Sequence, residues 1–449
     1  MISYGLGDAG TGLAATQLGS FLFLFFTSEA GLPAFTAGLL LMVVKLWDAF
    51  NDPLIGWLSD HTKSRWGPRL PWMVGAAVPL GFSLAAMWWV PPGTPLEKTL
   101  YYVYISILLM TAYTSVNLPF AALSTELTEE TSIRTRLNAA RFTGSILASL
   151  AGVTVAALLI ENPRYGYLAM GKVTGVIATI ATLVSAWGLA PFAKKARQPI
   201  QKKESFILQL RRILNNNKFL TVIRLYLLLW CGLQLTQTVA VIYLEQVMGV
   251  PGEVAKWILV PFQISALIGL QVWSFFSNKY GRINALNTGG KIWIGACIIA
   301  FILPSIAGFD SFNDLFLLNA FEKLKFLLLV ITILSFGFGA STAFLIPWSL
   351  LPDAIDADPE KPAGIYTAWM VFIQKIGIGL SVLLFGALLS ASGYQSIRIC
   401  EELQECIRQP FSAQLAIRLS IGLIPALLIL IGLSMMKRWP TQKAHLLNN

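Results

Sequence analysis

Two acidic side chains stand inside an apolar segment of the chain, where their oxygens could bind a cation. Asp48 and Asp52 are four residues apart, so a helix places both on one face, with Asn51 beside Asp52. If the segment crosses a membrane, a charge there costs about 2.5 kcal/mol or more, so it usually faces water, a partner charge or an ion. Carboxylate, hydroxyl and amide oxygens suit Na⁺ or a proton. We therefore expect a cation site here.

A second polar group lies in the stretch TAYTSVNLPFAAL, where Thr114 and Asn117 precede Pro119. Proline has no backbone N–H, so the carbonyl about four residues earlier loses its donor. Pro53 has the same effect next to Asp52. Such breaks are tolerated inside a membrane where they are buried in protein or line a cavity. We expect two broken helices whose polar residues meet in one site.

Few other ionisable residues stand well inside apolar segments, namely Lys45, Arg141 and Lys375. Asp8 lies so near the start of the first segment that it is open to an interfacial interpretation. Asp48, Asp52, Lys45 and Lys375 also fit a buried ion network that only holds the two halves together. Charges inside a membrane are functional by default, which favours a site. For Arg141, a structural role and a site role both stay open.

Composition decides the class of protein. The chain of 449 residues is 55% hydrophobic and 12% charged, with a mean hydropathy of +0.66. Spans of about 20 apolar residues place such a chain in lipid, whereas one soluble core would bury it poorly. The net charge of +10 lies mainly in alternate short loops and a central stretch, which orients a membrane protein and does not indicate nucleic-acid binding. Two histidines supply neither a zinc site nor a Ser/His/Asp triad, so we expect no enzyme and no cofactor beyond a coupling ion.

Apolar runs separated by polar turns predict an all-α membrane protein with twelve spans. The expected spans are 5–29, 34–59, 71–91, 98–125, 137–160, 166–190, 219–247, 254–277, 285–307, 323–350, 363–392 and 412–436. They predict a six-helix bundle over 1–190, a cytoplasmic linker over 191–218 and a second six-helix bundle over 219–449. Basic loops on alternate sides place both termini in the cytoplasm.

The two halves carry a similar turn after their second span, DHTKSRWGPR and SNKYGR. The matching position indicates an internal duplication of the kind found in transporters. We interpret the turn as conformational, because it lacks the glycine-rich run after a strand that binds nucleotides. Its residues are Asp60, Arg65, Gly67, Arg69, Gly281 and Arg282.

Two cysteines, Cys400 and Cys406, share the polar loop SIRICEELQECIRQP on the predicted outer side. In an oxidising compartment they could form a local disulfide. Two free thiols fit the sequence equally well.

Five stretches carry a family signature: KLWDAFNDPLIGWLSDHTKSRWGPRLPW, YTSVNLPFAALSTELT, AARFTGS, IPWSLLPDAID and VFIQKIGIGL. They resemble the glycoside-pentoside-hexuronide:cation symporters, the melibiose-permease-like branch of the major facilitator superfamily, over essentially the whole chain. The resemblance implies the major facilitator fold and a coupling-cation site at Asp48, Asp52 and Thr114, with Na⁺ held by the two carboxylates. It also implies Arg141 near the sugar cavity and Lys375 near both sites.

The substrate residues match that family less well. Asn117 stands where a sugar-binding carboxylate is expected, and Ala121 replaces a tryptophan. The acid expected in the first span falls at about Gly12, with Asp8 the only carboxylate nearby. A site that loses two acids and an aromatic platform cannot keep the same sugar preference. IPWSLLPDAID and the later SGYQ also resemble the sodium-dependent lysophospholipid symporters of the same family, whose cavity is more apolar.

These observations predict a multi-pass transporter of the inner or plasma cell membrane that couples Na⁺ or H⁺ to the symport of a sugar or glycoside by alternating access. A sodium-coupled lysophospholipid symporter is the alternative, and a membrane enzyme or assembly factor is disfavoured by the missing catalytic cluster. The substrate residues expected next to the cation, between the halves, are Arg141, Asn117, Lys375, Ala121 and Gln374. The expected partners are a small-molecule substrate, a coupling cation and membrane lipid, without nucleic acid, and we expect a monomer.

Overall fold

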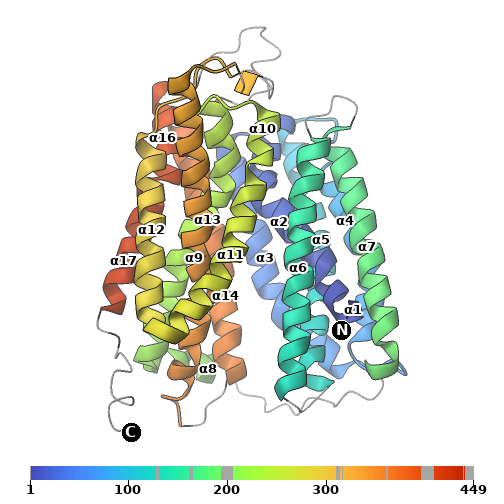
Figure 1. The fold of residues 1–449 in the computed structure, drawn as a ribbon. Helices are drawn as coiled ribbons and strands as arrows, with labels where there is room; N and C mark the ends of the chain where they lie inside the picture. Colours follow the sequence, from blue (N-terminus) through green and yellow to red (C-terminus); the bar gives the residue numbers. More distant parts are fainter. Residues whose placement is uncertain are drawn as a thin grey trace, which may run out of the picture. The chain divides into compact units, whose positions relative to one another are not determined.

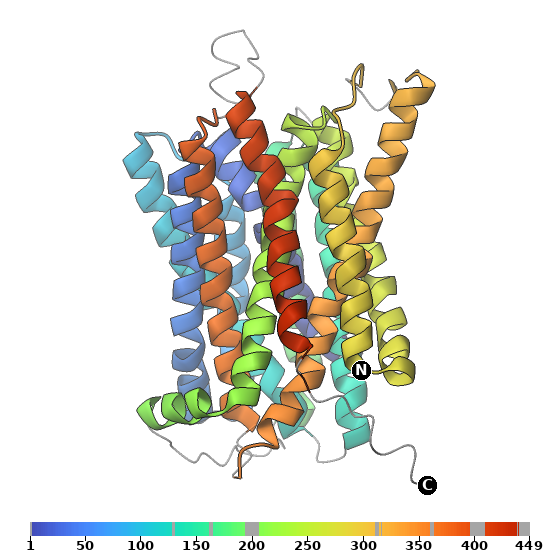
Figure 2. The same ribbon diagram turned by 90° about the vertical axis from the view of Figure 1, so that its left-hand side faces the viewer.

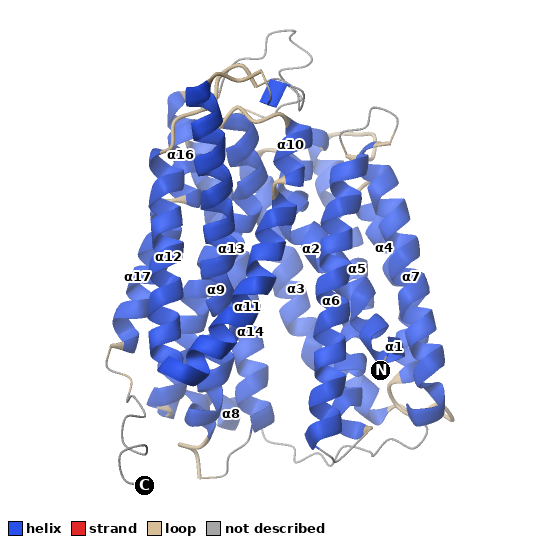
Figure 3. Cartoon of the chain, in the orientation of Figure 1, coloured by secondary structure: helices blue, strands red, loops and turns tan. Residues whose placement is uncertain are grey.

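The computed structural model consists of helices joined by short loops wherever it describes the chain, and the described residues contain no strand (Figure 3). It describes residues 2–127, 131–160, 165–193, 206–309, 314–315, 317–359, 363–395, 409–437 and 439. The predicted all-α class is therefore confirmed for these residues. Cys400 and Cys406 lie outside the described residues, and so does the side chain of Asp60.

The helices group into two compact units (Figure 1). The first contains the helices before Lys202 and the second those after Lys203. This division falls within the residues 191–218 that the sequence assigns to a linker. The bundle boundaries at 190 and 219 stay a prediction.

The first unit contains seven α-helices and two short irregular helical turns in its described residues. They are α1 (Ile2–Gly5), η1 (Leu6–Asp8), α2 (Ala9–Leu24), η2 (Phe25–Glu29), α3 (Ala34–His61), α4 (Leu70–Met87), α5 (Pro95–Glu126), α6 (Thr131–Leu159) and α7 (Gly166–Ala193). Figure 2 shows the long helices running alongside one another within the unit.

The second unit begins with the short helix α8 and contains both long apolar helices and shorter ones. They are α8 (Phe206–Asn215), α9 (Asn217–Gln246), α10 (Gly252–Trp257), α11 (Leu259–Tyr280), α12 (Arg282–Ile302), α13 (Ala320–Ile355), α14 (Ala363–Ala391), α16 (Phe411–Ile421) and α17 (Leu423–Met436).

Eleven segments of the described chain are helical, long and apolar enough to cross a membrane. The first, Ser3–Glu29, joins α1, η1, α2 and η2, while α10 with α11 and α16 with α17 each form one more. The expected fifth span corresponds to α6, whose apolar part in the described residues is the shorter Leu147–Leu159. The other expected spans each overlap one of the eleven.

The prolines do not interrupt their helices. α3 continues from Ala34 to His61 through Pro53, and α5 from Pro95 to Glu126 through Pro119. The predicted helix breaks are therefore wrong at both positions. A proline removes one backbone hydrogen bond, but packing against neighbouring helices can keep both flanking segments helical.

Side-chain caps begin three of the long helices. Thr94 Oγ1 accepts the backbone N–H of Glu97 at 3.4 Å, and Glu97 Oε2 accepts that of Thr94 at 2.7 Å, which is a capping box at the start of α5. Asn216 and Asn319 cap α9 and α13 through their side-chain oxygens. Each cap fixes where the apolar helix starts.

Glycines let the helices of the first unit approach one another closely. A Cβ at Gly144 of α6 would overlap the backbone of Gly5 in α1, and one at Gly12 of α2 would lie 2.5 Å from Ser145 Oγ. Small residues at such contacts are typical of membrane helix pairs. α6 therefore lies directly against α1 and α2, which brings its Arg141 to the start of α2.

We expect Gly144→Ala to lower the unfolding temperature of the detergent-purified chain, because the added methyl has no room beside Gly5. Overpacking of this kind costs about 1–3 kcal/mol. Gly75→Ala in α4 is the matched control, since a Cβ there meets nothing within 4 Å and alanine favours the helix. Equal unfolding temperatures for the two variants would contradict the close packing of α6.

Candidate functional site

The carboxylate site consists of Asp48, Asn51 and Asp52 on α3 and Thr114 on α5. Thr114 Oγ1 lies 3.4 Å from Asp48 Oδ1 and 3.2 Å from Asp52 Oδ1. A hydroxyl has one hydrogen, so Thr114 donates to only one of the two carboxylates at a time. The structure thus brings together the acids and the threonine that the sequence singles out.

The two carboxylates lie in surroundings that strengthen their mutual repulsion. Asp48 is 4% exposed and Asp52 is half-buried. Two ionised carboxylates around one hydroxyl repel each other, and the repulsion grows as water is excluded. A bound cation or proton would remove it. Within the described residues no three His, Cys, Asp or Glu side chains gather, so this oxygen set fits a monovalent cation or a proton.

Hydrogen bonds between α3 and α5 hold the site in register. Trp47 Nε1 donates to Thr111 Oγ1 at 3.0 Å, and Asn51 Nδ2 donates to the Met110 carbonyl at 3.3 Å. Asn51 is 2% exposed, and its side-chain oxygen has no hydrogen-bond partner among the described residues. A buried oxygen without a donor is rare because its desolvation is costly. Asn51 thus offers an additional neutral oxygen next to Asp52 in the sequence.

A second polar group, the Asp8 cluster, consists of Asp8, Thr11, Asn117 and Arg141. Asp8 Oδ1 accepts from Asn117 Nδ2 at 2.6 Å and from Thr11 Oγ1 at 2.9 Å, and Asp8 Oδ2 accepts from Arg141 Nε at 3.0 Å. Asp8 is 5% exposed. Side chains of α5 and α6 therefore enclose the carboxylate within the protein, while its depth in the membrane stays a prediction.

Phe120 of α5 packs against this cluster. A Cβ at Gly7 would overlap the Phe120 ring, so the backbone before Asp8 lies directly on that ring. The guanidinium carbon of Arg141 lies 5.8 Å from the centroid of the ring, within the range of a cation–π contact. Tyr4 packs on the same ring at 4.6 Å between centroids. One aromatic side chain thus positions both members of the ion pair.

Packing also explains why the acid is not at Gly12, where the family resemblance places it. The hypothetical Cβ at Gly12 lies 2.5 Å from Ser145 Oγ and 2.9 Å from the Ser145 carbonyl oxygen. The contact of α2 with α6 leaves no space for a side chain there. Asp8, four residues earlier, is the nearby carboxylate, and its part in substrate binding stays a prediction.

The two polar groups are neighbours along α5. Thr114 and Asn117 are three residues apart, which places them on adjacent turns of one helix face. Ala121 lies one turn beyond Asn117, and its role in binding stays a prediction.

Two predicted substrate residues, Gln374 and Lys375, belong to α14 of the second unit. Gln374 Oε1 accepts from Tyr226 Oη at 2.9 Å, and Trp348 Nε1 donates to the same hydroxyl at 3.2 Å. Lys375 is half-buried beside Gln374 in the sequence. Their part in substrate binding stays a prediction.

Gln374 thereby joins an aromatic group, the Tyr226 cluster, which consists of Tyr226, Trp230, Phe344, Trp348 and Gln374. The Trp230 and Phe344 rings lie 5.0 Å apart between centroids, edge to face. Trp230 Nε1 is buried and has no hydrogen-bond partner among the described residues. The sequence analysis missed Trp230 and Tyr226, since aromatic residues abound in lipid-facing helices and their spacing carries no signal.

The turn of the first unit closes through a glycine and an arginine. Gly67 has φ of +85°, and a Cβ there would lie 2.5 Å from the Ala193 carbonyl oxygen. Arg69 is 4% exposed and donates from Nη1 to Ser59 Oγ at 2.6 Å. Arg65 is exposed and packs on Trp66.

The turn of the second unit uses the same residue types with another partner. Gly281 has φ of +92° and starts α12. Arg282 donates from Nη2 to Asp353 Oδ2 at 2.7 Å and from Nη1 to the Ser349 carbonyl, both on α13. The two arginines therefore fix different helices, and the conformational role of both turns stays a prediction.

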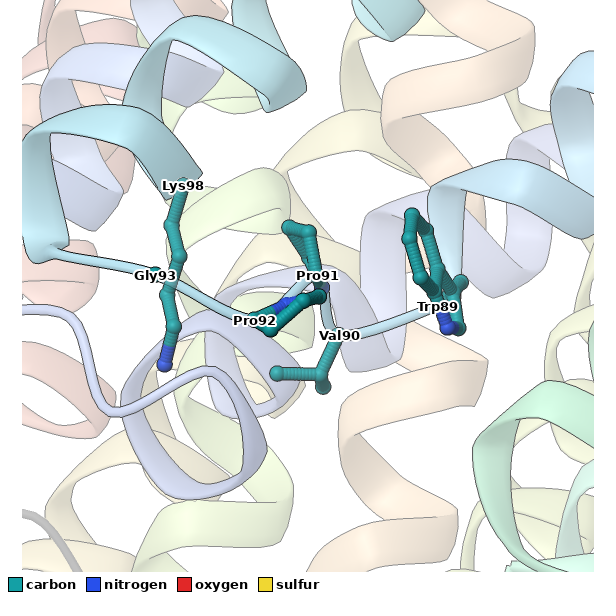
Figure 4. A pocket seen from close by; sticks show the side chains of 6 residues that line it. All are labelled: Trp89, Val90, Pro91, Pro92, Gly93 and Lys98. Atoms are coloured by element: carbon teal, nitrogen blue, oxygen red, sulfur yellow. The ribbon is translucent and has the colours of Figure 1, made fainter.

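A pocket of about 310 Å³ lies in the loop between α4 and α5 (Figure 4). It is lined by Trp89, Val90, Pro91, Pro92, Gly93 and Lys98. Lys98 Nζ donates to the Ala30 carbonyl at 3.0 Å, which satisfies the end of η2. None of the predicted site residues lines this pocket.

Solved structures identify the fold. The nucleoside transporter NupG matches 97% of this chain and 100% of its own with a TM-score of 0.70 and 15% identity. A bacterial homolog of the human lysosomal transporter Spinster, inward-facing and occupied, gives a TM-score of 0.66 and 15% identity over 96% of this chain and 94% of its own. The chain therefore shares the fold of these solved transporters.

The family model described as MFS/sugar transport protein matches residues 3–443. An uncharacterized symporter of Synechocystis sp. is 31% identical over 99% of this chain and 94% of its own length. The inner membrane symporter YicJ of Escherichia coli is 23% identical (99% and 92%), and the sodium-dependent lysophosphatidylcholine symporter 1 of Gallus gallus is 23% identical (98% and 86%). The chain therefore belongs to the MFS/sugar transport family, and it is a multi-pass transport protein of the cell membrane.

The ion pair between Asp8 and Arg141 should show strong coupling in a double-mutant cycle. Removing one partner of a buried pair costs about 3–5 kcal/mol, since the other charge is left without its partner. The double variant Asp8→Asn with Arg141→Gln should therefore lower the unfolding temperature by less than the sum of the decreases in the two single variants. Strictly additive effects would show that the pair contributes nothing to holding α2 against α6.

Proposed function

We propose that this transporter couples the inward movement of Na⁺ or H⁺ to the symport of a small polyhydroxylated solute, a sugar or glycoside. The observation that carries the proposal is the adjacency of the carboxylate site and the Asp8 cluster along α5. Transport, with no catalytic step, is the function we infer, because the chain belongs to a family of transport proteins. The cytoplasmic location of both termini and the action as a monomer are part of the same proposal.

The cation step follows from the electrostatics of α3 and α5. A cation or proton between Asp48 and Asp52 offsets one of their two negative charges, which lowers their repulsion, and it draws their oxygens and Thr114 into one arrangement. Because Thr114 and Asn117 share a helix face, fixing the first helps to fix the second. The coupling is reciprocal, so substrate at the Asp8 cluster must strengthen cation binding by the same factor.

The chemistry of the Asp8 cluster supports a hydroxylated substrate. Asp8 contributes acceptor oxygens, Arg141 charged donors and Asn117 both kinds of group. Vicinal sugar hydroxyls donate and accept at once, and charge-assisted hydrogen bonds to them are the strong ones. Movement across the membrane would follow by alternating access, which is how transporters built from repeats work.

The Tyr226 cluster favours a second candidate, a lysophospholipid. Phe344 and Trp348 are each 36% exposed, so the aromatic faces are accessible. Aromatic side chains around a polar centre bind quaternary ammonium groups by cation–π attraction. Several relatives of the chain, such as the one from Gallus gallus, are sodium-dependent lysophosphatidylcholine symporters.

Uptake by proteoliposomes separates the two candidates. The purified chain is reconstituted into proteoliposomes, and radiolabelled glycosides, pentoses, glucuronides or lysophosphatidylcholine are added outside. Each solute is tested with an inward Na⁺ gradient, an inward H⁺ gradient or none. We expect gradient-driven accumulation of one sugar or glycoside and none of the lysolipid. Accumulation of the lysolipid alone would replace the sugar assignment, and uptake that ignores both gradients would refute cation coupling.

Variants of the carboxylate site test the coupling directly. Asp52→Asn should abolish concentrative uptake while leaving exchange of substrate between equal pools, because the charge that holds the cation is gone. Thr114→Ala should raise the cation concentration for half-maximal uptake by about tenfold or more, as expected for a lost ligand. Asp353→Asn, an acid of α13 that pairs with Arg282, is the matched control and should keep the cation dependence. Wild-type accumulation by Asp52→Asn would place the cation elsewhere.

A further inference from the structure

We propose that α8 is a docking surface for anionic phospholipid, and that the lipid bound there stabilises the junction of α13 and α14. The surface is formed by Leu208, Arg211 and Leu214 of α8 and Lys218 at the start of α9. The proposal concerns a part of the molecule that the carboxylate site and the Asp8 cluster do not touch.

The outer face of α8 alternates apolar and basic side chains. Leu208 is 51% exposed and Leu214 55% exposed, with the exposed Arg211 midway between them. A spacing of three residues keeps all three on one side of a helix. Lys218, also exposed, follows one turn after Leu214. Figure 2 shows α8 lying across the end of α9, which is the orientation of a helix in a membrane interface.

The opposite face of α8 is anchored in the protein. Ile213 is 2% exposed, and Arg212 Nη1 lies 3.6 Å from Asp358 Oδ2, in the loop after α13. Asp358 is only 9% exposed. One basic residue of α8 therefore pairs with the protein, while its neighbour Arg211 faces outward.

A buried hydrogen-bond chain extends this anchor to α14. Tyr366 Oη donates to Asp358 Oδ2 at 2.9 Å. Asn216, between α8 and α9, donates from Nδ2 to Tyr366 Oη at 3.0 Å and to the Ala354 carbonyl at 2.8 Å. Tyr366 is fully buried and packs against Phe219. Displacing α8 would therefore disturb both the end of α13 and the start of α14.

The charge pattern selects the occupant. Exposed leucines on a surface helix enter the boundary between headgroups and acyl chains, where the flanking arginine and lysine meet phosphate groups. No exposed acid stands on this face of α8, whose sequence FILQLRRILN contains none. A phospholipid with net negative charge, such as phosphatidylglycerol, meets both requirements, whereas a zwitterionic lipid of the same chains meets only the apolar one.

Native mass spectrometry of the full chain in detergent tests the surface, without Na⁺ or transported substrate. The probes are phosphatidylglycerol and phosphatidylcholine with identical acyl chains. We expect phosphatidylglycerol to be retained in preference, and retention to fall about fivefold for each charge removed in Arg211→Gln and Lys218→Gln. Lys437→Gln, at an exposed lysine that ends α17, is the matched control and should retain the lipid as the wild type does. Equal retention of both lipids, or unchanged retention by Arg211→Gln with Lys218→Gln, would overturn the proposal.

Hydrogen exchange in nanodiscs tests the link to α13 and α14. Replacing phosphatidylcholine by phosphatidylglycerol should slow amide exchange across Ala354 to Tyr366 in the wild type. In Asp358→Asn the lipid should still bind but exchange should no longer respond. Tyr366→Phe removes the same hydrogen bond with less change of charge, and it carries the same expectation if Asp358→Asn does not fold. Exchange that ignores the lipid in the wild type would show that α8 is not coupled to this junction.

Discussion

The proposed coupling depends on one constraint, the repulsion between the carboxylates of Asp48, which is buried, and Asp52, which is half-buried. Asp48 and Asp52 share the hydroxyl of Thr114 at 3.4 and 3.2 Å. The two carboxylates repel each other when both are ionised, and the repulsion grows where water is excluded. Other contacts hold α3 against α5, among them the hydrogen bond from Trp47 to Thr111. The stored repulsion is what a coupling cation can relieve.

In the proposed mechanism, cation binding affects substrate binding because α5 carries Thr114 of the carboxylate site and Asn117 of the Asp8 cluster. Asn117 lies one turn from Thr114 and donates to Asp8, whose other oxygen is held by Arg141. A shift of α5 that accommodates a cation would therefore also move Asn117 and change its hydrogen bond to Asp8. In the proposed mechanism the link is a single helix with a residue of each polar group on one face, which is a physical route for coupling free energy.

The sequence predicted the fold and the carboxylate site well because both follow from local rules. Long apolar runs determine the spans. A spacing of four residues places Asp48 and Asp52 on one face of any helix that contains both. The meeting of these acids with Thr114 was expected from the polar residues beside Pro53 and Pro119, and the family resemblance implies it as well. The burial of Asp8 could not be predicted from the spacing of residues, because it depends on α6. The close approach of α6 in turn depends on contacts such as that of Gly5 with Gly144. The predicted helix breaks at Pro53 and Pro119 were wrong for the opposite reason. The local rule that proline interrupts a helix was overridden by packing against neighbouring helices.

The most direct test of the cation account is calorimetric titration of Na⁺ into the purified chain at several pH values, with the protons released per Na⁺ counted from buffers of different ionisation enthalpy. If Asp48 and Asp52 form the site, Na⁺ and protons compete for the same oxygens. The apparent affinity should then fall as the pH is lowered, with proton release rising in step, and binding should vanish in Asp52→Asn. Sodium binding that is independent of pH, or that survives in Asp52→Asn, would contradict the account.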